Sequence, residues 1–288
     1  MSELSKSSQR DAGNSDGEPQ NDLTRDFSVA EWHALKELRS LLPEILEQAY
    51  DARPGARTVP ITIWGVTLDP NGVRDAQASV VLMKWLRATH IILDVAEAKK
   101  NMIATLRWRE EFKADEVTAE HFPEAYGKLG HIHGEDKQGR PVIYMYDGNP
   151  EASMAAGDAQ RLLRWRVALM ERAITKCDFK SVDQVVEVSE FGPKPVEEGA
   201  AAKALVLELK QILSKHYPDI VAHRLILNVP KAMTWFWCIF NPMIPKYTHE
   251  RVKVVGGDYS AIRTALLAFI DSQQLPDKYS RAVDSEEA

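Results

Sequence analysis

The one close pair of histidines is the first place in the sequence where metal chemistry is conceivable. His131 and His133 lie two residues apart, and on a strand this spacing places both rings on one face. Neither a nearby cysteine nor a defined carboxylate ligand completes a metal-binding set. We therefore interpret the pair as chance neighbours beside a turn and predict no metal site.

Motifs that bind phosphate or activate a nucleophile are equally weak. Gly256-Gly257-Asp258 lacks the flanking residues of a P-loop or of a dinucleotide-binding fingerprint. The sequence contains no Gly-x-Ser-x-Gly elbow, and Glu197-Glu198-Gly199 is typical of a solvated helix start. We predict that the protein is not an enzyme. A small hydrolase is the enzymatic alternative, and it lacks a credible nucleophile–base motif.

An aromatic run in the last quarter of the chain has two interpretations. It is either part of an ordinary core or an amphipathic helix whose aromatic face meets a cavity or a bilayer interface. In the second interpretation, Asn241-Pro242 ends the helix and helps to form a hinge. The large apolar members of the run are Trp235, Phe236, Trp237, Ile239 and Phe240.

Composition limits the classes of partner. The 288 residues carry 36 basic and 42 acidic side chains, a formal net charge of -6, so the overall charge does not attract nucleic acid. Any attraction to anionic membranes must come from local patches. Cys177 and Cys238 provide no disulfide framework, which fits a reducing, intracellular compartment. The most apolar stretch, Thr234 to Ile244, is too short to span a bilayer, so we expect a soluble protein with peripheral membrane contact.

The first part of the chain is predicted to be helical after a polar tail. Residues 1–27 are rich in polar side chains and are expected to be disordered. Ser28 and Glu31 have the spacing of a capping box, and Pro43 is expected to divide the following leucine-rich stretch into two helices. Residues 53–65 are read as a connector, and two more helices follow, the second over residues 93–112. This predicts a helical domain over residues 28–114.

Strands and helices alternate in the remainder. Such alternation implies an α/β layer with a mainly parallel sheet, here over residues 115–280 with a flexible end at 281–288. The expected strands are Gly130–His133, Val142–Tyr146, Val185–Val188, Leu225–Val229 and Val252–Val255. The expected helices are Asp158–Thr175, Ala200–His216, Met233–Phe240 and Tyr259–Ser272.

Five segments, in this order, resemble the CRAL-TRIO family of lipid-transfer proteins. They run from about Asp75 to Tyr279, and their agreement in order carries more weight than any one of them. The segments are the helices closing on Trp108-Arg109, the hairpin Gly134-Glu135-Asp136-Lys137-Gln138-Gly139-Arg140-Pro141-Val142, Lys215-His216-Tyr217-Pro218, Ile226-Leu227-Asn228-Val229-Pro230, and Leu275-Pro276-Asp277-Lys278-Tyr279.

Two further segments narrow the resemblance to the atypical fungal phosphatidylinositol transfer proteins, some of which bind haem. These segments are Trp64-Gly65-Val66-Thr67-Leu68 and the stretch Arg164 to Glu171. The resemblance implies a helical N-terminal domain followed by an α/β lobe, in which the sheet floors a lipid cavity closed by an amphipathic gate helix. The aromatic run after Met233 corresponds to that gate.

The resemblance also assigns residues to the cavity. Arg224 corresponds to a basic residue that contacts the inositol phosphate, and a guanidinium suits phosphate chemically; the alternative is a solvated charge. Glu187 corresponds loosely to an acidic residue of the headgroup site. The expected pocket lining is Tyr144, Tyr146, Arg166, Ser189 and Phe191, although the two tyrosines have plain packing as their alternative.

Haem is the alternative ligand, and the sequence departs from the haem-binding relatives where iron would bind. Those relatives use a His-x-Tyr pair, at which this chain has Ser189-Glu190-Phe191. Arg166 and Arg224 still match the partners of the haem propionates. An iron ligand would then have to be Tyr144, Tyr146 or His223, so no cofactor is expected to be required.

The predicted function is therefore the binding of one phospholipid, foremost phosphatidylinositol. The protein would exchange it between membranes or present it to a lipid-modifying enzyme. We expect a cytoplasmic monomer that associates transiently with the surface of the endoplasmic reticulum or another membrane, with no nucleic-acid partner. A haem protein acting in redox or stress response is the alternative.

Overall fold

The computed structural model describes residues 17–89, 93–147, 158–192, 200–229, 251–256 and 258–280. Its contacts divide the chain into two compact units. Unit 1 comprises Met1–Glu116, Asp178–Asp183 and Lys210–Ile220, and unit 2 comprises Val117–Cys177, Gln184–Leu209 and Val221–Ala288. The expected gate helix at Met233–Phe240 and the C-terminal end at 281–288 lie outside the described residues. Within the described part, no helix is long and apolar enough to cross a membrane.

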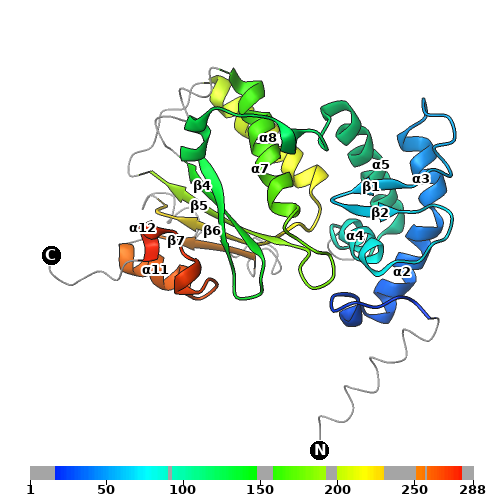
Figure 1. Cartoon of the computed structure of the whole chain (residues 1–288), viewed down its shortest axis with the longest axis horizontal. Coiled ribbons are helices and arrows are strands. Elements are labelled where there is room, and N and C mark those ends of the chain that lie inside the picture. Colours follow the sequence, from blue (N-terminus) through cyan, green and yellow to red (C-terminus); the bar gives the residue numbers. More distant parts are fainter. Residues whose placement is uncertain are drawn as a thin grey trace, which may run out of the picture. The chain divides into compact units, whose positions relative to one another are not determined.

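In the described part of unit 1, four complete α-helices form the frame (Figure 1). Ser28 accepts a hydrogen bond from the Glu31 backbone and Glu31 reaches back to the Ser28 backbone, so the expected capping box is present. Pro43 lies in the first turn of the next helix and separates the two, as predicted. Asp75 and Asp94 cap the other two helices. The helices are α2 (Val29–Ser40), α3 (Leu42–Ala49), α4 (Ala76–Arg87) and α5 (Val95–Phe112).

A hairpin replaces part of the predicted connector in unit 1. Strands β1 (Ile61–Ile63) and β2 (Val66–Leu68) pair antiparallel around Trp64 and Gly65. Both turn residues have positive φ, 51° and 78°, which is the conformation that a tight two-residue hairpin turn requires. Reading residues 53–65 as connector was therefore wrong from Ile61 onward, because glycine in the second turn position makes the pairing possible.

The expected N-terminal tail is ordered from residue 17 onward, so the prediction of disorder is wrong for residues 17–27. Glu18 is buried and both its carboxylate oxygens accept hydrogen bonds from Arg39 Nη1, at 3.0 and 2.8 Å. Asn21 accepts hydrogen bonds from the backbone of the short helix η2 (Thr24–Asp26) and donates to the Phe179 carbonyl. These polar contacts offset an ordering cost that the composition alone does not reveal.

Two segments from the second half of the sequence belong to unit 1. The predicted division of the chain at a single boundary after residue 114 does not include them. Lys84 on α4 is fully buried and donates to Asp183 Oδ2 at 2.7 Å and to the Asp219 carbonyl at 3.2 Å. His216 stacks on Trp108 with ring centroids 4.4 Å apart. Burial lowers the pKa of His216 to about 4, so its ring stays neutral inside this aromatic contact.

Unit 2 is built on a five-stranded sheet in the order β3-β4-β5-β6-β7. The first pair is antiparallel and the other three are parallel, which confirms the predicted α/β class with a mainly parallel sheet. The strands are β3 (Gly130–Glu135), β4 (Pro141–Asp147), β5 (Val185–Phe191), β6 (Val221–Leu227) and β7 (Val252–Val255). Helices η3 (Val117–Ala119) and η4 (Glu124–Lys128) precede the sheet, α7 (Ala159–Ile174) and α8 (Ala200–His216) connect its strands, and α11 (Tyr259–Leu267), η7 (Ser272–Gln274) and α12 (Asp277–Ser280) follow β7. The residues of α8 from Lys210 onward belong to unit 1.

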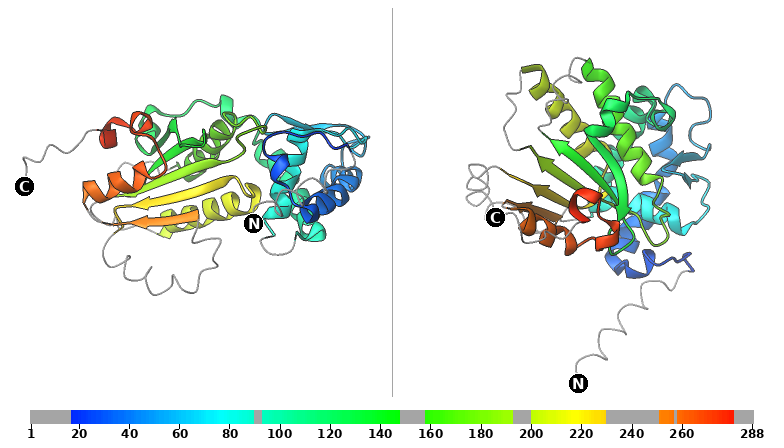
Figure 2. Two further views of the ribbon diagram at one scale, coloured as in Figure 1. Left: turned by 90° about the horizontal axis from the view of Figure 1, so that it is seen from below. Right: turned by 60° about the vertical axis from the view of Figure 1, so that its left-hand side comes forward.

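The two faces of the sheet have different coverings (Figure 2). Helices α11 and α12 cover one face, where apolar side chains of β4, β5 and β6 join Leu266, Ile270 and Tyr279 in one buried cluster. Helix α7 lies over the opposite face and contacts β3 and β4. Because side chains alternate along each strand, every residue of the central strands belongs to one of these two environments.

The hairpin between β3 and β4 is held by one buried carboxylate. Asp136 Oδ1 accepts hydrogen bonds from the backbone of Gln138 and Arg140 at 2.9 Å each, and Asp136 Oδ2 accepts from Arg140 Nε at 2.7 Å. Gly139 has a φ of 75°, which suits the tight turn. The residues of this motif are therefore explained by the geometry of the turn.

We expect Lys84→Ala to destabilise the protein by about 3 kcal/mol, because it leaves the Asp183 carboxylate without its buried partner. Chemical denaturation of the wild type and the variant measures the difference. Lys100→Ala is the matched control, since the Lys100 side chain is 75% exposed, and it should change stability by less than about 0.5 kcal/mol. Equal losses in the two variants would contradict a special role for the buried lysine.

Candidate functional site

The α7 face of the sheet carries a cluster of three charged side chains. Glu187 lies on the central strand β5, and its register neighbour on β6 is Arg224. Arg166 reaches the same carboxylate from α7. Three of the residues expected to line one ligand site are thus brought together by a strand, its neighbour and the covering helix.

The carboxylate of Glu187 is shared between the two guanidinium groups. Arg166 Nη2 forms an ion pair with Glu187 Oε1. Arg224 Nε lies 2.9 Å and Arg224 Nη2 2.7 Å from Glu187 Oε2. The side chains of Arg166 and Glu187 are 4% and 5% exposed, whereas that of Arg224 is 43% exposed. The cluster is therefore buried on the α7 side and open to solvent at Arg224.

The two arginines keep Glu187 ionised. Burial alone would raise the pKa of the Glu187 carboxyl, but the charges and hydrogen bonds of Arg166 and Arg224 outweigh it and hold the pKa below the ordinary value of 4.5. A cluster of two cations and one anion has a formal charge of +1. A second anionic group would therefore be favoured beside it.

One hydrogen-bond donor of this cluster is not used within it. Arg166 Nη1 is buried and has no hydrogen-bond partner among the residues that the structure describes. An unpaired buried donor costs free energy, most of all in a charged group. A ligand oxygen at this position would supply the missing acceptor.

The same face becomes mainly apolar toward the carboxyl ends of the strands. Ser189 and Phe191 follow Glu187 at the two-residue period of β5. Met145 and Ile226 are the register neighbours of Ser189, and Val254 is next to Ile226 on β7. All five of these side chains are only partly buried among the residues that the structure describes. The face thus combines a charged end with an apolar surface, which is the character of an amphiphile-binding site.

The structure does not bring Tyr144 and Tyr146 to this face. Tyr144 pairs in register with Val188 and Tyr146 with Glu190, so both tyrosines point to the side covered by α11 and α12. Tyr144 is only 1% exposed and packs on Tyr279 with ring centroids 6.3 Å apart. Placing them in one lining with Ser189 and Phe191 was a mistake of strand parity, and packing, the alternative for these residues, describes Tyr144 better.

Glu190, between Ser189 and Phe191, points to the α12 side as well. Its Oε1 accepts from Asn228 Nδ2 at 2.7 Å, and its Oε2 accepts from Tyr279 OH at 2.5 Å and pairs with Lys278. Burial and the neighbouring carboxylate raise the pKa of the Tyr279 hydroxyl. The segment Leu275 to Tyr279 therefore fastens the C-terminal helix to the sheet.

The histidine pair does not form a metal centre in the described part of the chain. His131 and His133 have ring centroids 6.3 Å apart, and His131 stacks on Tyr144. No group of three or more potential ligands gathers among the described residues. The expected gate residues, Trp235 to Phe240, lie outside the described residues.

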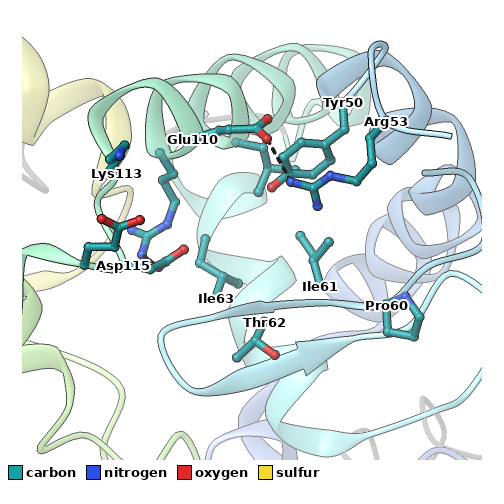
Figure 3. A pocket seen from close by; sticks show the side chains of 12 residues that line it. Tyr50, Arg53, Pro60, Ile61, Thr62, Ile63, Glu110, Lys113 and Asp115 are labelled. Atoms are coloured by element: carbon teal, nitrogen blue, oxygen red, sulfur yellow. Dashed lines mark hydrogen bonds and ion pairs between the residues drawn. The ribbon is translucent and has the colours of Figure 1, made fainter. Parts of the chain in front are cut away.

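Unit 1 has a cavity of about 370 Å³ between the β1–β2 hairpin and α5 (Figure 3). Its charges are largely paired with one another. Arg53 Nη2 lies 2.8 Å from Glu110 Oε1, and Arg109 pairs with Asp115. Because these charges neutralise one another, the cavity favours neither an anionic nor a cationic ligand.

The pairing of Arg166 with Glu187 was not predicted, although the sequence contains a signal for the burial of Arg166. Leu163, Val167 and Met170 form the apolar stripe of α7, and Arg166 occupies a position within that stripe. All four side chains are buried. A basic residue at a core-facing helix position predicts a buried acidic partner on the element below.

Comparisons with known proteins find similar sequences and a similar fold. A family model described as CRAL/TRIO domain matches residues 125–280. Patellin-6 of Arabidopsis thaliana is 31% identical over 266 residues, which cover 88% of this chain and 63% of that protein. A phosphatidylinositol transfer protein, SFH5 of Phaeosphaeria nodorum, is 28% identical over 202 residues, 62% of this chain and 60% of that protein. The chain thus spans less than two thirds of the length of these relatives.

A solved structure, that of Sfh5, shares the fold. It superposes with a TM-score of 0.62 at 19% sequence identity, covering 78% of this chain and 80% of that one. This likeness confirms the predicted architecture of a helical N-terminal region and an α/β lobe.

Glu187→Gln tests the charge cluster. We expect a loss of about 3 kcal/mol at neutral pH, because Arg166 would remain buried without its counter-charge. Since the pKa of Glu187 is lower in the folded than in the unfolded state, its contribution is complete above about pH 4.5 and is lost as the pH falls through the folded value. The difference between wild type and variant in denaturation experiments should therefore shrink in acid.

Glu208→Gln is the matched control for that experiment, since Glu208 is exposed on α8. Its effect on stability should be small at every pH. A Glu187→Gln difference that persisted unchanged into strong acid would show that ionisation of Glu187 is not what stabilises the cluster.

Proposed function

Because the chain belongs to the CRAL/TRIO family of lipid-binding and lipid-transfer proteins, we propose that it binds one phospholipid, foremost phosphatidylinositol, on the α7 face of its sheet. It exchanges this lipid between membranes or presents it to a lipid-modifying enzyme, and it performs no catalysis itself. We place it in the cytoplasm as a monomer that associates transiently with the endoplasmic reticulum or another membrane.

The unpaired donor of Arg166 carries this proposal. A buried guanidinium nitrogen without an acceptor among the described residues, beside a cluster of formal charge +1, favours an anionic oxygen as the missing partner. Arg224 adds an accessible guanidinium on the open side of the same cluster. A lipid phosphate satisfies both requirements, since it has several acceptor oxygens and a negative charge.

The chemistry of Glu187 favours a headgroup with hydroxyls. An ionised carboxylate only accepts hydrogen bonds, and a sugar-like ring of hydroxyls donates them. Phosphatidylinositol combines such a ring with a phosphate. Its acyl chains would lie along the apolar part of the face, over Met145, Phe191 and Ile226.

The name of one relative agrees with this headgroup. The fungal SFH5 protein is named a phosphatidylinositol transfer protein, whereas the patellin name states no ligand. At 28% identity the name supports a phospholipid ligand for this chain and leaves the headgroup to be tested.

Haem is the alternative ligand, and the geometry favours it less. The three candidate iron ligands, Tyr144, Tyr146 and His223, share the face covered by α11 and α12. Tyr144 is fully buried there, and the His223 ring lies 4.9 Å from that of Phe269. A visible absorption spectrum of the purified protein separates the two ligands, since only haem gives a Soret band.

Arg224→Ala tests the headgroup site. The variant removes the accessible guanidinium and keeps the buried Arg166–Glu187 pair, so we expect the protein to fold. Loading with phosphatidylinositol from mixed vesicles should fall about ten-fold, the usual effect of losing a charged hydrogen bond, while loading with diacylglycerol, which lacks the phosphate, should change little. Native mass spectrometry of the reisolated protein measures both.

Arg161→Ala is the control, because Arg161 is exposed at the start of α7. It should load both lipids as the wild type does. An unchanged lipid ratio in Arg224→Ala would contradict the assignment of Arg224 to the headgroup.

A further inference from the structure

The charge of the protein poses a problem for membrane docking. At a formal net charge of -6, the chain as a whole is repelled by an anionic bilayer surface. A protein that exchanges lipids must nevertheless reach that surface. The attraction therefore has to come from a local patch in which cations outweigh their acidic neighbours.

An open groove of about 510 Å³ in unit 1 has this property. It is lined by residues of α5 and by Gln48 of α3. Its lining contains three basic side chains and no acidic one. The lining residues are Gln48, Ala96, Lys99, Lys100, Ile103, Ala104 and Arg107.

The three cations are compensated to different degrees. Arg107 Nη2 donates to the Gln48 carbonyl oxygen at 2.6 Å, a neutral acceptor that leaves the charge of the guanidinium in place. Lys100 is 75% exposed and lies 3.2 Å from Glu97 Oε2, a surface pair that water largely screens. Lys99 lies 2.6 Å from Glu44 Oε1 and is the most fully compensated of the three. The positive potential of the groove is therefore centred on Lys100 and Arg107.

Apolar side chains lie between these cations. Ala96, Lys100, Ile103 and Arg107 follow one another at intervals of four, three and four residues, so they share one stripe of α5. Ile103 is only partly buried there. A stripe that alternates cations with apolar side chains matches the boundary between lipid headgroups and acyl chains, where both kinds of group are stabilised.

The linings of the two other cavities described in unit 1 contain acidic as well as basic side chains. The cavity of about 370 Å³ is lined by Glu110, Asp115 and Glu116 as well as by basic residues. A third, of about 420 Å³, contains Glu18 and Asp69 beside its cations, and Arg39 is paired with Glu18. The α5 groove is thus the one among the three whose lining contains basic side chains and no acidic one.

We propose that the α5 groove of unit 1 is a docking surface for the anionic headgroups of a membrane, with Lys100 and Arg107 as its principal contacts. This docking site lies in a different unit from the headgroup cluster around Glu187. It rests on the proposed function only in so far as lipid exchange requires a membrane. Docking and lipid loading therefore depend on different residues and fail separately.

Vesicle flotation with the full chain tests the proposal. The variant Lys100→Gln/Arg107→Gln is compared with the wild type on vesicles of phosphatidylcholine alone and on vesicles in which part of it is replaced by phosphatidylserine. Each basic residue near an anionic surface strengthens binding about five-fold, so the double variant should partition about 30-fold more weakly onto the anionic vesicles. Raising the salt concentration should remove most of the wild-type binding.

Arg25→Gln/Lys210→Gln is the matched control, since it removes two exposed cations of unit 1 and changes the net charge equally. It should bind the anionic vesicles within about two-fold of the wild type. Equal losses in both double variants would assign the effect to net charge and overturn the groove as a docking site. Wild-type partitioning of the groove variant, or absence of wild-type binding, would also overturn it.

Phosphatidylinositol loading of the same variants separates this proposal from the proposed function. The groove variant should still load the lipid once incubated with an excess of vesicles, because the Arg166–Glu187–Arg224 cluster is intact. Loss of loading in Arg224→Ala with normal flotation, and the reverse in the groove variant, is the expected pattern. Parallel loss of both activities in the groove variant would contradict the separation of the two sites.

Discussion

A carboxylate at the centre of a buried parallel sheet has to be compensated, and this constraint organises unit 2. Glu187 is 4% exposed on the middle strand, where desolvation opposes its charge. Arg166 must therefore lie on the covering face of α7, and Arg224 must occupy the neighbouring position on β6. The register between β5 and β6 and the rotation of α7 are both tied to this one charge. Two cations around one anion leave an excess of positive charge in a partly apolar surface.

Two glutamates of the same strand show how a sealed cluster differs from an open one. Glu190 receives hydrogen bonds or ion pairs from Asn228, Lys278 and Tyr279, and it faces the side closed by α12. The cluster around Glu187 retains a buried Arg166 nitrogen without a partner in the described residues and a half-exposed Arg224. Similar side chains thus stabilise the fold on one face and remain available to a ligand on the other. Because β5 alternates its side chains, three residues of sequence separate the two roles.

Elements that depend on local sequence patterns could be predicted from the sequence. Features that depend on strand pairing or on contacts between distant segments could not. The capping box at Ser28, the division at Pro43 and all five strands of the sheet follow from local patterns. The tyrosine pair was assigned to the wrong face because strand parity relative to Glu187 depends on the register between β4 and β5. The ordered segment from residue 17 depends on Arg39 and Phe179, which are distant in sequence. The burial of Arg166 could have been predicted from its place in the apolar stripe of α7, but the identity of its partner, Glu187, could not.

Separating membrane attraction from ligand recognition resolves a conflict between two electrostatic demands. A headgroup site must hold its anion in a specific, partly buried cluster, and strong positive potential there would also retain the lipid after docking. A docking surface needs weak, screened and exposed cations, because it has to release the membrane after each exchange. The exposed Lys100 and the buried Arg166 represent these two kinds of charge, and they belong to different units. Under the proposed docking, the net negative charge of the chain limits nonspecific adsorption and makes membrane contact depend on one local surface.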